Sequence, residues 1–203
     1  MKTPEVIVFD LGKVLVDFDY SIASRKIAAH GKVPAAAVQQ FIDHSALLFR
    51  FETGSIDRRQ FYEAICQITG YTGSLEEFSC FFADIFTPIA EMVALHARLR
   101  EQRVPTAIFS NTNDLAIEHI RRNFAFFAHF DAYVLSYEHG AMKPDARLYQ
   151  EVERVTRRQG EQIGYLDDRL ENAQAGAARG WQVIHHQTPA QSIAALRRLG
   201  LPV

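Results

Sequence analysis

The stretch Val6-Ile7-Val8-Phe9-Asp10-Leu11-Gly12 decides the fold. Its first four residues are apolar and mostly β-branched, which predicts a strand buried on both faces, as in a parallel sheet covered by helices. The strand ends at a carboxylate, Asp10. Ligands of open parallel sheets bind at the carboxyl ends of the strands, and a carboxylate is costly to bury there without a cation or hydrogen-bond donors. We therefore expect a central strand ending in a candidate site residue, although an ordinary turn residue would give the same short pattern.

The rest of the chain alternates apolar runs with helical patterns. Further strands are predicted at residues 104–109, 131–136, 162–166 and 181–185. Helix start and stop residues predict helices between these runs. Strands that alternate with helices form right-handed crossovers and a mostly parallel sheet. The predicted fold class is therefore α/β, with a doubly wound, Rossmann-like sheet.

No convincing strand is found between about Tyr20 and Pro88. Capping residues and helical spacing instead predict helices at 21–30, 34–51, 58–69 and 74–86. We therefore expect two domains. An α/β core would be made of residues 1–19 and 89–203, and a helical cap of residues 20–88 would be inserted after the first strand, above the carboxyl edge of the sheet and over Asp10.

Composition limits the partners of the protein. The 203 residues include 22 Lys and Arg against 24 Asp and Glu, for a net charge of −2, and no basic stripe indicates a nucleic-acid or membrane partner. No apolar run has membrane-spanning length, and the start does not resemble a signal peptide. Cys66 and Cys80 lie outside metal-type spacing, which fits a reducing compartment. We expect a cytoplasmic protein, and the sequence leaves its oligomeric state open.

Polar side chains follow four of the predicted strands, at the edge where the carboxyl ends of parallel strands meet. They are Asp10 after the first strand, Ser110 and Asn111 after the second, Lys143 in the loop after the third, and Asp167 and Asp168 after the fourth. Each alone has an ordinary explanation as a helix cap, a solvated lysine or a helix-dipole partner. Together, in this order and at one edge of one sheet, they predict a site.

The chemistry of this set suits phosphoryl transfer. An Asp carboxylate can attack phosphorus and form an aspartyl-phosphate, which is the role open to Asp10. Mg²⁺ takes one or two carboxylates with backbone oxygen and water, here Asp10 and Asp168 with the carbonyl of Gly12. The Ser110 hydroxyl suits phosphate oxygens at a helix start, and Lys143 would neutralise charge on nucleophile and phosphate. The residues therefore favour a magnesium-dependent enzyme with a small phosphorylated substrate.

The whole chain resembles the haloacid dehalogenase-like (HAD) hydrolase superfamily. Its motifs are similar to residues 6–14, 108–111, 143–144 and 164–168. Within the superfamily, the chain most resembles the phosphatases with Asp-Leu-Gly in their first motif, which are similar to bacterial phosphatases of α-D-glucose 1-phosphate. The resemblance therefore implies a phosphoric monoester hydrolase with a helical cap.

The resemblance also implies residue roles. Asp10 would be the nucleophile. Phosphate would be bound by Ser110, Asn111 and Lys143. Asp168 would be the preferred metal ligand, with Asp167 as a second ligand or as an acid beside the metal.

Gly12 departs from the superfamily pattern. Its phosphatases usually carry a second Asp at this position as general acid and base, and losing such a group commonly costs about 10² to 10⁴ in rate. Three explanations stay open. The substrate could have a good leaving group such as an anomeric hydroxyl. Asp17 or Asp19 could substitute. Or the protein could be a weak enzyme, or a binder of phosphorylated ligands without turnover.

Two related chemistries are alternatives. Haloacid dehalogenases of the superfamily carry an aromatic residue where Gly12 stands and need no metal. Phosphonate hydrolases carry a small residue there and use a cap lysine as a Schiff base, for which Lys26 and Lys32 are candidates. The predicted lysine and paired acids of the core suit metal-dependent phosphoryl transfer better.

The cap is expected to choose the substrate, because cap side chains would close over the leaving group and exclude water. The candidates that could face the site are Phe41, His44, Phe49, Arg50, Phe51 and Glu52. Among them, Arg50 or His44 could contact a sugar hydroxyl.

Overall fold

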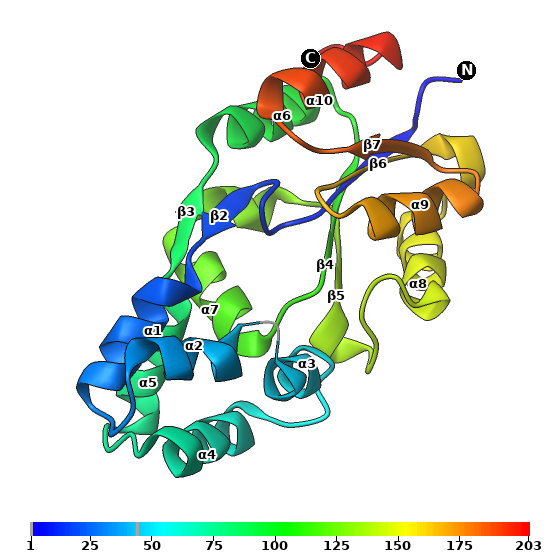
Figure 1. Cartoon of the computed structure of the whole chain (residues 1–203). Helices are drawn as coiled ribbons and strands as arrows, with labels where there is room; N and C mark the ends of the chain where they lie inside the picture. The colour runs from blue at the N-terminus through cyan, green and yellow to red at the C-terminus, as the bar shows by residue number, and fades with distance from the viewer. Residues whose placement is uncertain (1, 44) are drawn as a thin grey trace.

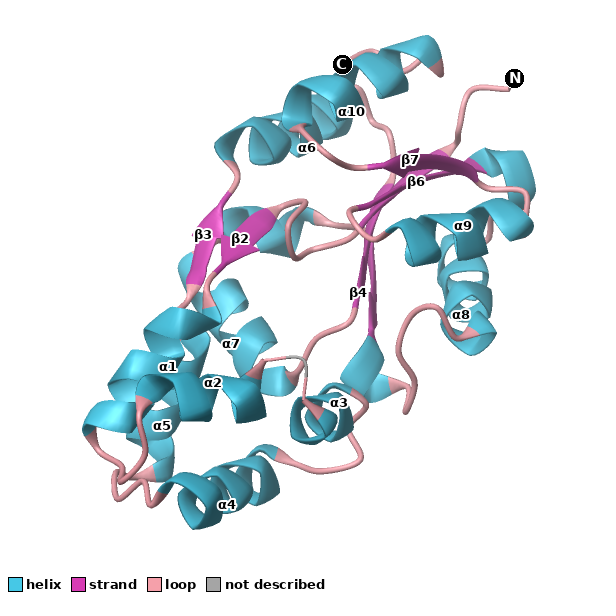
Figure 2. Cartoon of the chain, in the orientation of Figure 1, coloured by secondary structure: helices cyan, strands magenta, loops and turns pink. Residues whose placement is uncertain are grey.

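A central parallel sheet organises the chain. The computed structural model describes residues 2–43 and 45–203. In these residues the sheet has five parallel strands in the order β5 (Ala132–Leu135), β4 (Thr106–Ser110), β1 (Val6–Phe9), β6 (Ile163–Asp167) and β7 (Gln182–His185). Figures 1 and 2 show this sheet with helices around it. Phe9 at the end of β1 is level with Ile108 and Leu166, so the carboxyl ends of the three central strands are aligned. The predicted α/β fold is confirmed.

Helices cover both faces of the sheet, which explains the unbroken apolar run of β1. Ile7 and Phe9 belong to a cluster with α6 (Ala90–Glu101), α7 (Asp114–Asn123) and α10 (Pro189–Arg198). The alternate residues of the strand point to the other face, as a two-residue period requires. There they meet side chains of α8 (Ala146–Thr156), with α9 (Leu170–Ala178) packed beside β6 and β7. No helix among the described residues is both long and apolar enough to cross a membrane.

The segment predicted as a cap contains five helices in its described residues. They are α1 (Tyr20–Ala29), α2 (Ala35–Ile42), α3 (Ala46–Glu52), α4 (Arg58–Thr69) and α5 (Leu75–Ala83). They enclose their own apolar cluster, in which Phe51 stacks on Phe61 with ring centroids 4.5 Å apart. We keep the name cap for residues 20–88. Its domain boundaries stay a prediction.

Two local predictions are wrong. The helix predicted over 34–51 is divided into α2 and α3, because the hydroxyl of Ser45 accepts a hydrogen bond from the Leu48 N–H at 2.9 Å and starts a second helix. The stretch 86–88 was expected to be free of strand, but it forms β3 (Phe86–Pro88). This strand pairs antiparallel with β2 (Val16–Phe18), apart from the main sheet (Figure 2). The pair joins the core to the cap.

Candidate active site

A cavity of about 730 Å³ lies between the carboxyl edge of the sheet and the cap. From the core it is lined by Asp10, Gly12, Asn111, Lys143 and Asp168, among others. The cap contributes as well, since residues of α2 and α3 also line the cavity. A volume of this size accommodates a small ligand.

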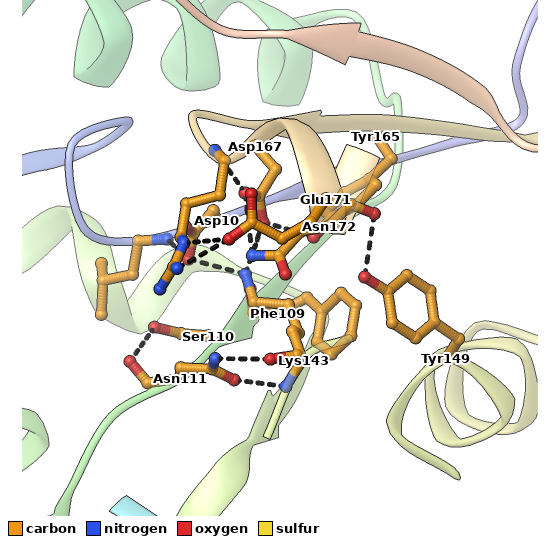
Figure 3. Close-up of polar contacts among 12 residues, drawn as sticks. Asp10, Phe109, Ser110, Asn111, Lys143, Tyr149, Tyr165, Asp167, Glu171 and Asn172 are labelled. Atoms are coloured by element: carbon orange, nitrogen blue, oxygen red, sulfur yellow. Dashed lines mark hydrogen bonds and ion pairs between the residues drawn. The ribbon is translucent and has the colours of Figure 1, made fainter. Parts of the chain in front are cut away.

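Lys143 is the centre of the site. Its Nζ donates to the carbonyl of Phe109 at 2.8 Å and to Oδ2 of Asp167 at 2.6 Å, and it lies 3.0 Å from Oδ1 of Asp10 (Figure 3). These three acceptors match the three N–H groups of an ammonium. The side chain is 1% exposed. Burial opposes its charge, but the two carboxylates outweigh burial and hold the pKa of Lys143 above its ordinary value.

Asp167 holds Lys143 in place and does not line the cavity. Its Oδ1 accepts from the Arg169 N–H at 2.9 Å and from Asn172 Nδ2 at 3.0 Å. Its Oδ2 accepts from Lys143 and from the hydroxyl of Tyr165. Burial favours its neutral form, yet Lys143 and these donors keep the pKa of Asp167 below its ordinary value. Asp167 is therefore a buried anion whose oxygens are already occupied.

Asp10 and Asp168 present the remaining carboxylates. Oδ1 of Asp10 accepts from the Leu11 N–H at 2.7 Å. Burial raises the pKa of Asp10 to about 8 against the opposing pull of Lys143, and burial together with Asp167 raises the pKa of Asp168. Both shifts favour the neutral acids, and a bound cation would oppose them by favouring the carboxylates.

A divalent cation fits this cluster. Oxygens of Asp10, Asp167 and Asp168 lie within 4.8 Å of one another. Three carboxylates and one ammonium, that of Lys143, sum to a charge of −2. Because Asp167 is saturated with hydrogen bonds, the oxygens free to bind a metal come from Asp10 and Asp168, and Gly12 lines the same cavity with its backbone.

Ser110 and Asn111, the two residues predicted to bind phosphate at the end of β4, make their side-chain hydrogen bonds to the protein backbone. Asn111 accepts from the Lys143 N–H at 2.7 Å and donates to the Lys143 carbonyl at 3.1 Å (Figure 3). Its side chain therefore fixes the loop that carries Lys143, while the residue still lines the cavity. Ser110 is 2% exposed and is not part of the cavity wall, and its hydroxyl lies 3.3 Å from the Asn111 carbonyl. Lys143 is the predicted phosphate-binding side chain that faces the cavity.

A side chain at position 12 would meet the ring of Phe18. A Cβ at this position would lie 2.9 Å from Cε1 of Phe18, the last residue of β2. Such a contact is shorter than carbon atoms tolerate, so an acid here would require the Phe18 ring to move. The absence of an Asp at position 12 is thus coupled to the position of the Phe18 ring.

Neither nearby acid presents a free carboxylate to the cavity. Asp17 pairs with Lys13, is largely exposed and is not in the cavity wall. Asp19 does line the cavity, but it is the N-cap of α1. Its two oxygens accept from the N–H and the hydroxyl of Ser21, each at 2.8 Å.

A protein-family model for haloacid dehalogenase-like hydrolases matches residues 4–180. The chain belongs to this family. Among solved structures, the chain is similar to a HAD family enzyme of Bacteroides thetaiotaomicron in complex with magnesium and inorganic phosphate. The TM-score is 0.80 at 19% identity, over 91% of this chain and 94% of that one. A predicted HAD-like family hydrolase from Porphyromonas gingivalis gives a TM-score of 0.81 at 20% identity, over 97% and 98% of the two chains.

The same fold also occurs in a dehalogenase. The L-2-haloacid dehalogenase of Xanthobacter autotrophicus matches with a TM-score of 0.65 at 17% identity, over 89% of this chain and 76% of that one. At such identities the similarity establishes a shared HAD fold. The reaction has to be inferred from the site.

Only some of the cap residues predicted to face the site of this HAD-like hydrolase line the cavity. Phe49 and Glu52 line the cavity, whereas Phe41 and Phe51 pack in the cap interior and Arg50 is exposed outside the cavity wall. The sixth candidate, His44, lies outside the described residues.

The two cap lysines lie away from the cavity. Lys26 forms an ion pair with Asp84 at 2.9 Å, and the side chain of Lys32 packs against Gly70. Neither is in the cavity wall.

Sequence reasoning missed Ser136, which connects cap and core. Its hydroxyl donates to the Glu52 carbonyl at 2.6 Å and accepts from the Thr112 N–H at 2.8 Å. Its position at a strand end could have indicated a role, because Ser136 directly follows β5 just as Ser110 ends β4. Nothing in the sequence indicated that its partner would come from the cap.

Proposed function

We propose that this HAD-like hydrolase is a Mg²⁺-dependent phosphatase of a small phosphorylated metabolite, a sugar phosphate in particular. The observation that carries the proposal is the buried Lys143 held between Asp10 and Asp167, with Asp168 beside them at the cavity wall. This set provides a nucleophile, a fixed cation for phosphate charge, and two carboxylates for a metal. The neighbour solved with magnesium and inorganic phosphate supports the same chemistry.

The reaction would begin with attack of an Asp10 carboxylate oxygen on phosphorus. The bond to the leaving alcohol breaks, and an aspartyl-phosphate forms on Asp10. Water then attacks the phosphorus, which releases inorganic phosphate and restores the carboxylate. Lys143 would stabilise the negative charge of nucleophile and phosphate from a position that the protein has already fixed. A bound Mg²⁺ ion would supply further positive charge against the phosphate oxygens.

The cap side of the cavity favours an uncharged, hydroxyl-rich leaving group. Among the described residues, the cap contributes polar and acidic side chains to the wall but neither Lys nor Arg. The polar ones are Tyr20, Gln39, Asp43, Ser45 and Glu52. A second phosphate or a carboxylate on the substrate would meet acids there, whereas sugar hydroxyls can hydrogen-bond to all of these groups.

A screen tests the proposal. Purified protein is incubated with a panel of sugar phosphates, phosphorylated polyols and sugar bisphosphates, with Mg²⁺ or with EDTA, and phosphate release is measured. We expect turnover of sugar monophosphates above about 1 s⁻¹ that requires Mg²⁺. Binding of these compounds without turnover would favour the alternative of a non-catalytic ligand-binding protein.

A further inference from the structure

The alcohol that leaves phosphorus needs a proton, and Gly12 has no side chain to supply one. In phosphoryl transfer the attacking and leaving oxygens lie roughly in line on opposite sides of phosphorus. Asp10 attacks from the sheet edge, so the leaving oxygen faces the cap. The proton donor must therefore be a cap residue, or a residue next to the cap, that reaches into the cavity.

Most groups on that side are unsuited to the task. Both oxygens of Asp19 are occupied as the N-cap of α1. Burial raises the pKa of Tyr20 well above its ordinary value, so the phenol is a weak acid. Asp43 accepts a hydrogen bond from Gln39 at 3.4 Å. By contrast, the carboxyl group of Glu52 has no hydrogen bond or ion pair with any described residue, although Glu52 lines the cavity.

Glu52 is also held firmly against the core. As the last residue of α3, it accepts through its carbonyl from Ser136, whose hydroxyl is bonded in turn to Thr112 beyond the end of β4. Two residues later the backbone of Gly54, with φ of +66°, approaches the core so closely that a Cβ would lie 2.2 Å from the Tyr137 carbonyl oxygen. This end of α3 is therefore docked on the sheet edge that carries the site.

The surroundings of Glu52 favour a proton on its carboxyl group. Burial raises the pKa of Glu52 to about 7; Arg169 opposes this shift and Asp43 adds to it. An acid whose pKa lies near the working pH is the most effective proton donor and acceptor.

We propose that Glu52 is the general acid and base of the reaction, in the role for which position 12 has no side chain. As Asp10 bonds to phosphorus and the bond to the leaving oxygen breaks, the Glu52 carboxyl group gives its proton to that oxygen and becomes a carboxylate. Water enters where the alcohol left. The carboxylate takes the proton of this water as its oxygen bonds to phosphorus, and the bond from phosphorus to Asp10 breaks. This proposal rests on the phosphatase function proposed above.

The test compares two substrates whose leaving groups share a phenol ring but differ in basicity, para-nitrophenyl phosphate and phenyl phosphate, with Mg²⁺. Nitrophenolate leaves without a proton, whereas phenolate benefits from one. For Glu52→Gln we expect kcat/KM to be nearly unchanged on the nitrophenyl ester and to fall about 100-fold on the phenyl ester. Glu63→Gln, the same change at an exposed position of α4, should change neither.

The outcomes are distinct. Equal losses on both esters, or no loss on either, would overturn the role of Glu52 and leave the phosphatase proposal standing. If the wild-type protein hydrolyses neither these esters nor any sugar phosphate of the panel above, the phosphatase proposal itself fails. If it hydrolyses only sugar phosphates, Glu52→Gln must lower kcat/KM on them about 100-fold, and an unchanged value would overturn the role of Glu52. Glu52→Asp provides a second variant that keeps the carboxyl group. If Glu52→Gln does not fold, Glu52→Asp must still show a larger loss on the phenyl ester, and an equal loss on both would again overturn the proposal.

Discussion

Replacing Lys143 by Met is expected to destabilise the protein strongly. The ammonium is 1% exposed and lies 2.6 Å from Asp167 and 3.0 Å from Asp10. Met preserves the length and packing of the side chain but leaves buried carboxylates without their cation. Removing one partner of a buried ion pair typically costs about 3–5 kcal/mol of unfolding free energy. We expect a loss of this size in urea unfolding, measured in EDTA so that no metal replaces the missing charge.

The chain provides a matched control for this variant. Lys2 and Glu5 form an ion pair with the same separation of 3.0 Å, but the Lys2 side chain is 63% exposed. Lys2→Met should leave the unfolding midpoint almost unchanged, because exposed pairs contribute little. The double variant Lys143→Met/Asp167→Asn should regain part of the loss, since one uncompensated charge is removed with the ammonium. A loss for Lys143→Met below about 1 kcal/mol, the range of exposed pairs, would refute the reasoning.

Two further predictions concern packing and pH. Gly12→Ala places a Cβ 2.9 Å from the Phe18 ring and should lower the unfolding free energy in urea by about 1–3 kcal/mol. Phe18→Leu should relieve this cost in the double variant. Losses that simply add in the double variant would contradict the clash. His96 is 1% exposed, and burial lowers its pKa from 6.5 to about 4. As the pH falls, the unfolded chain therefore takes up a proton at His96 before the folded protein does. Lowering the pH from 7 to 5 should cost the wild-type protein about 2 kcal/mol of unfolding free energy that a His96→Gln variant does not lose. The same pH dependence of unfolding in both proteins would count against this assignment.

The core of the site was predictable because it depends on strand ends. In a parallel sheet with aligned strands, residues that follow β1, β4 and β6 must meet at one edge, wherever they lie in the sequence. Asp10 after β1 and the acids Asp167 and Asp168 at the end of β6 can therefore be placed together from the sequence alone. Lys143 was placed by the same reasoning, since its loop follows β5.

Side-chain directions could not be predicted in this way. Asn111 follows a strand as expected, yet its amide bonds the backbone of Lys143, because a loop of the next crossover happens to pass beside it. Asp167 and Asp168 are adjacent, and only their hydrogen-bond partners show that the first is saturated and the second faces the cavity.

The junction between cap and core was the least predictable part. The strand Phe86–Pro88 is too short and too unlike a strand to be seen in the sequence, and it forms only because Val16–Phe18 lies opposite it. The docking of Glu52 on Ser136 likewise joins residues that are far apart in the chain. Such contacts depend on tertiary structure, which no local pattern encodes.

Phosphate release by the Asp10→Asn variant tests the central claim most directly. Asn keeps the size of the side chain but lacks the carboxylate that would attack phosphorus, so with Mg²⁺ and a substrate of the wild-type protein we expect no turnover above background. Circular dichroism and the unfolding midpoint would establish that the variant is folded. Full activity in a folded Asp10→Asn protein would contradict the assignment of Asp10 as the nucleophile, and with it the proposed reaction.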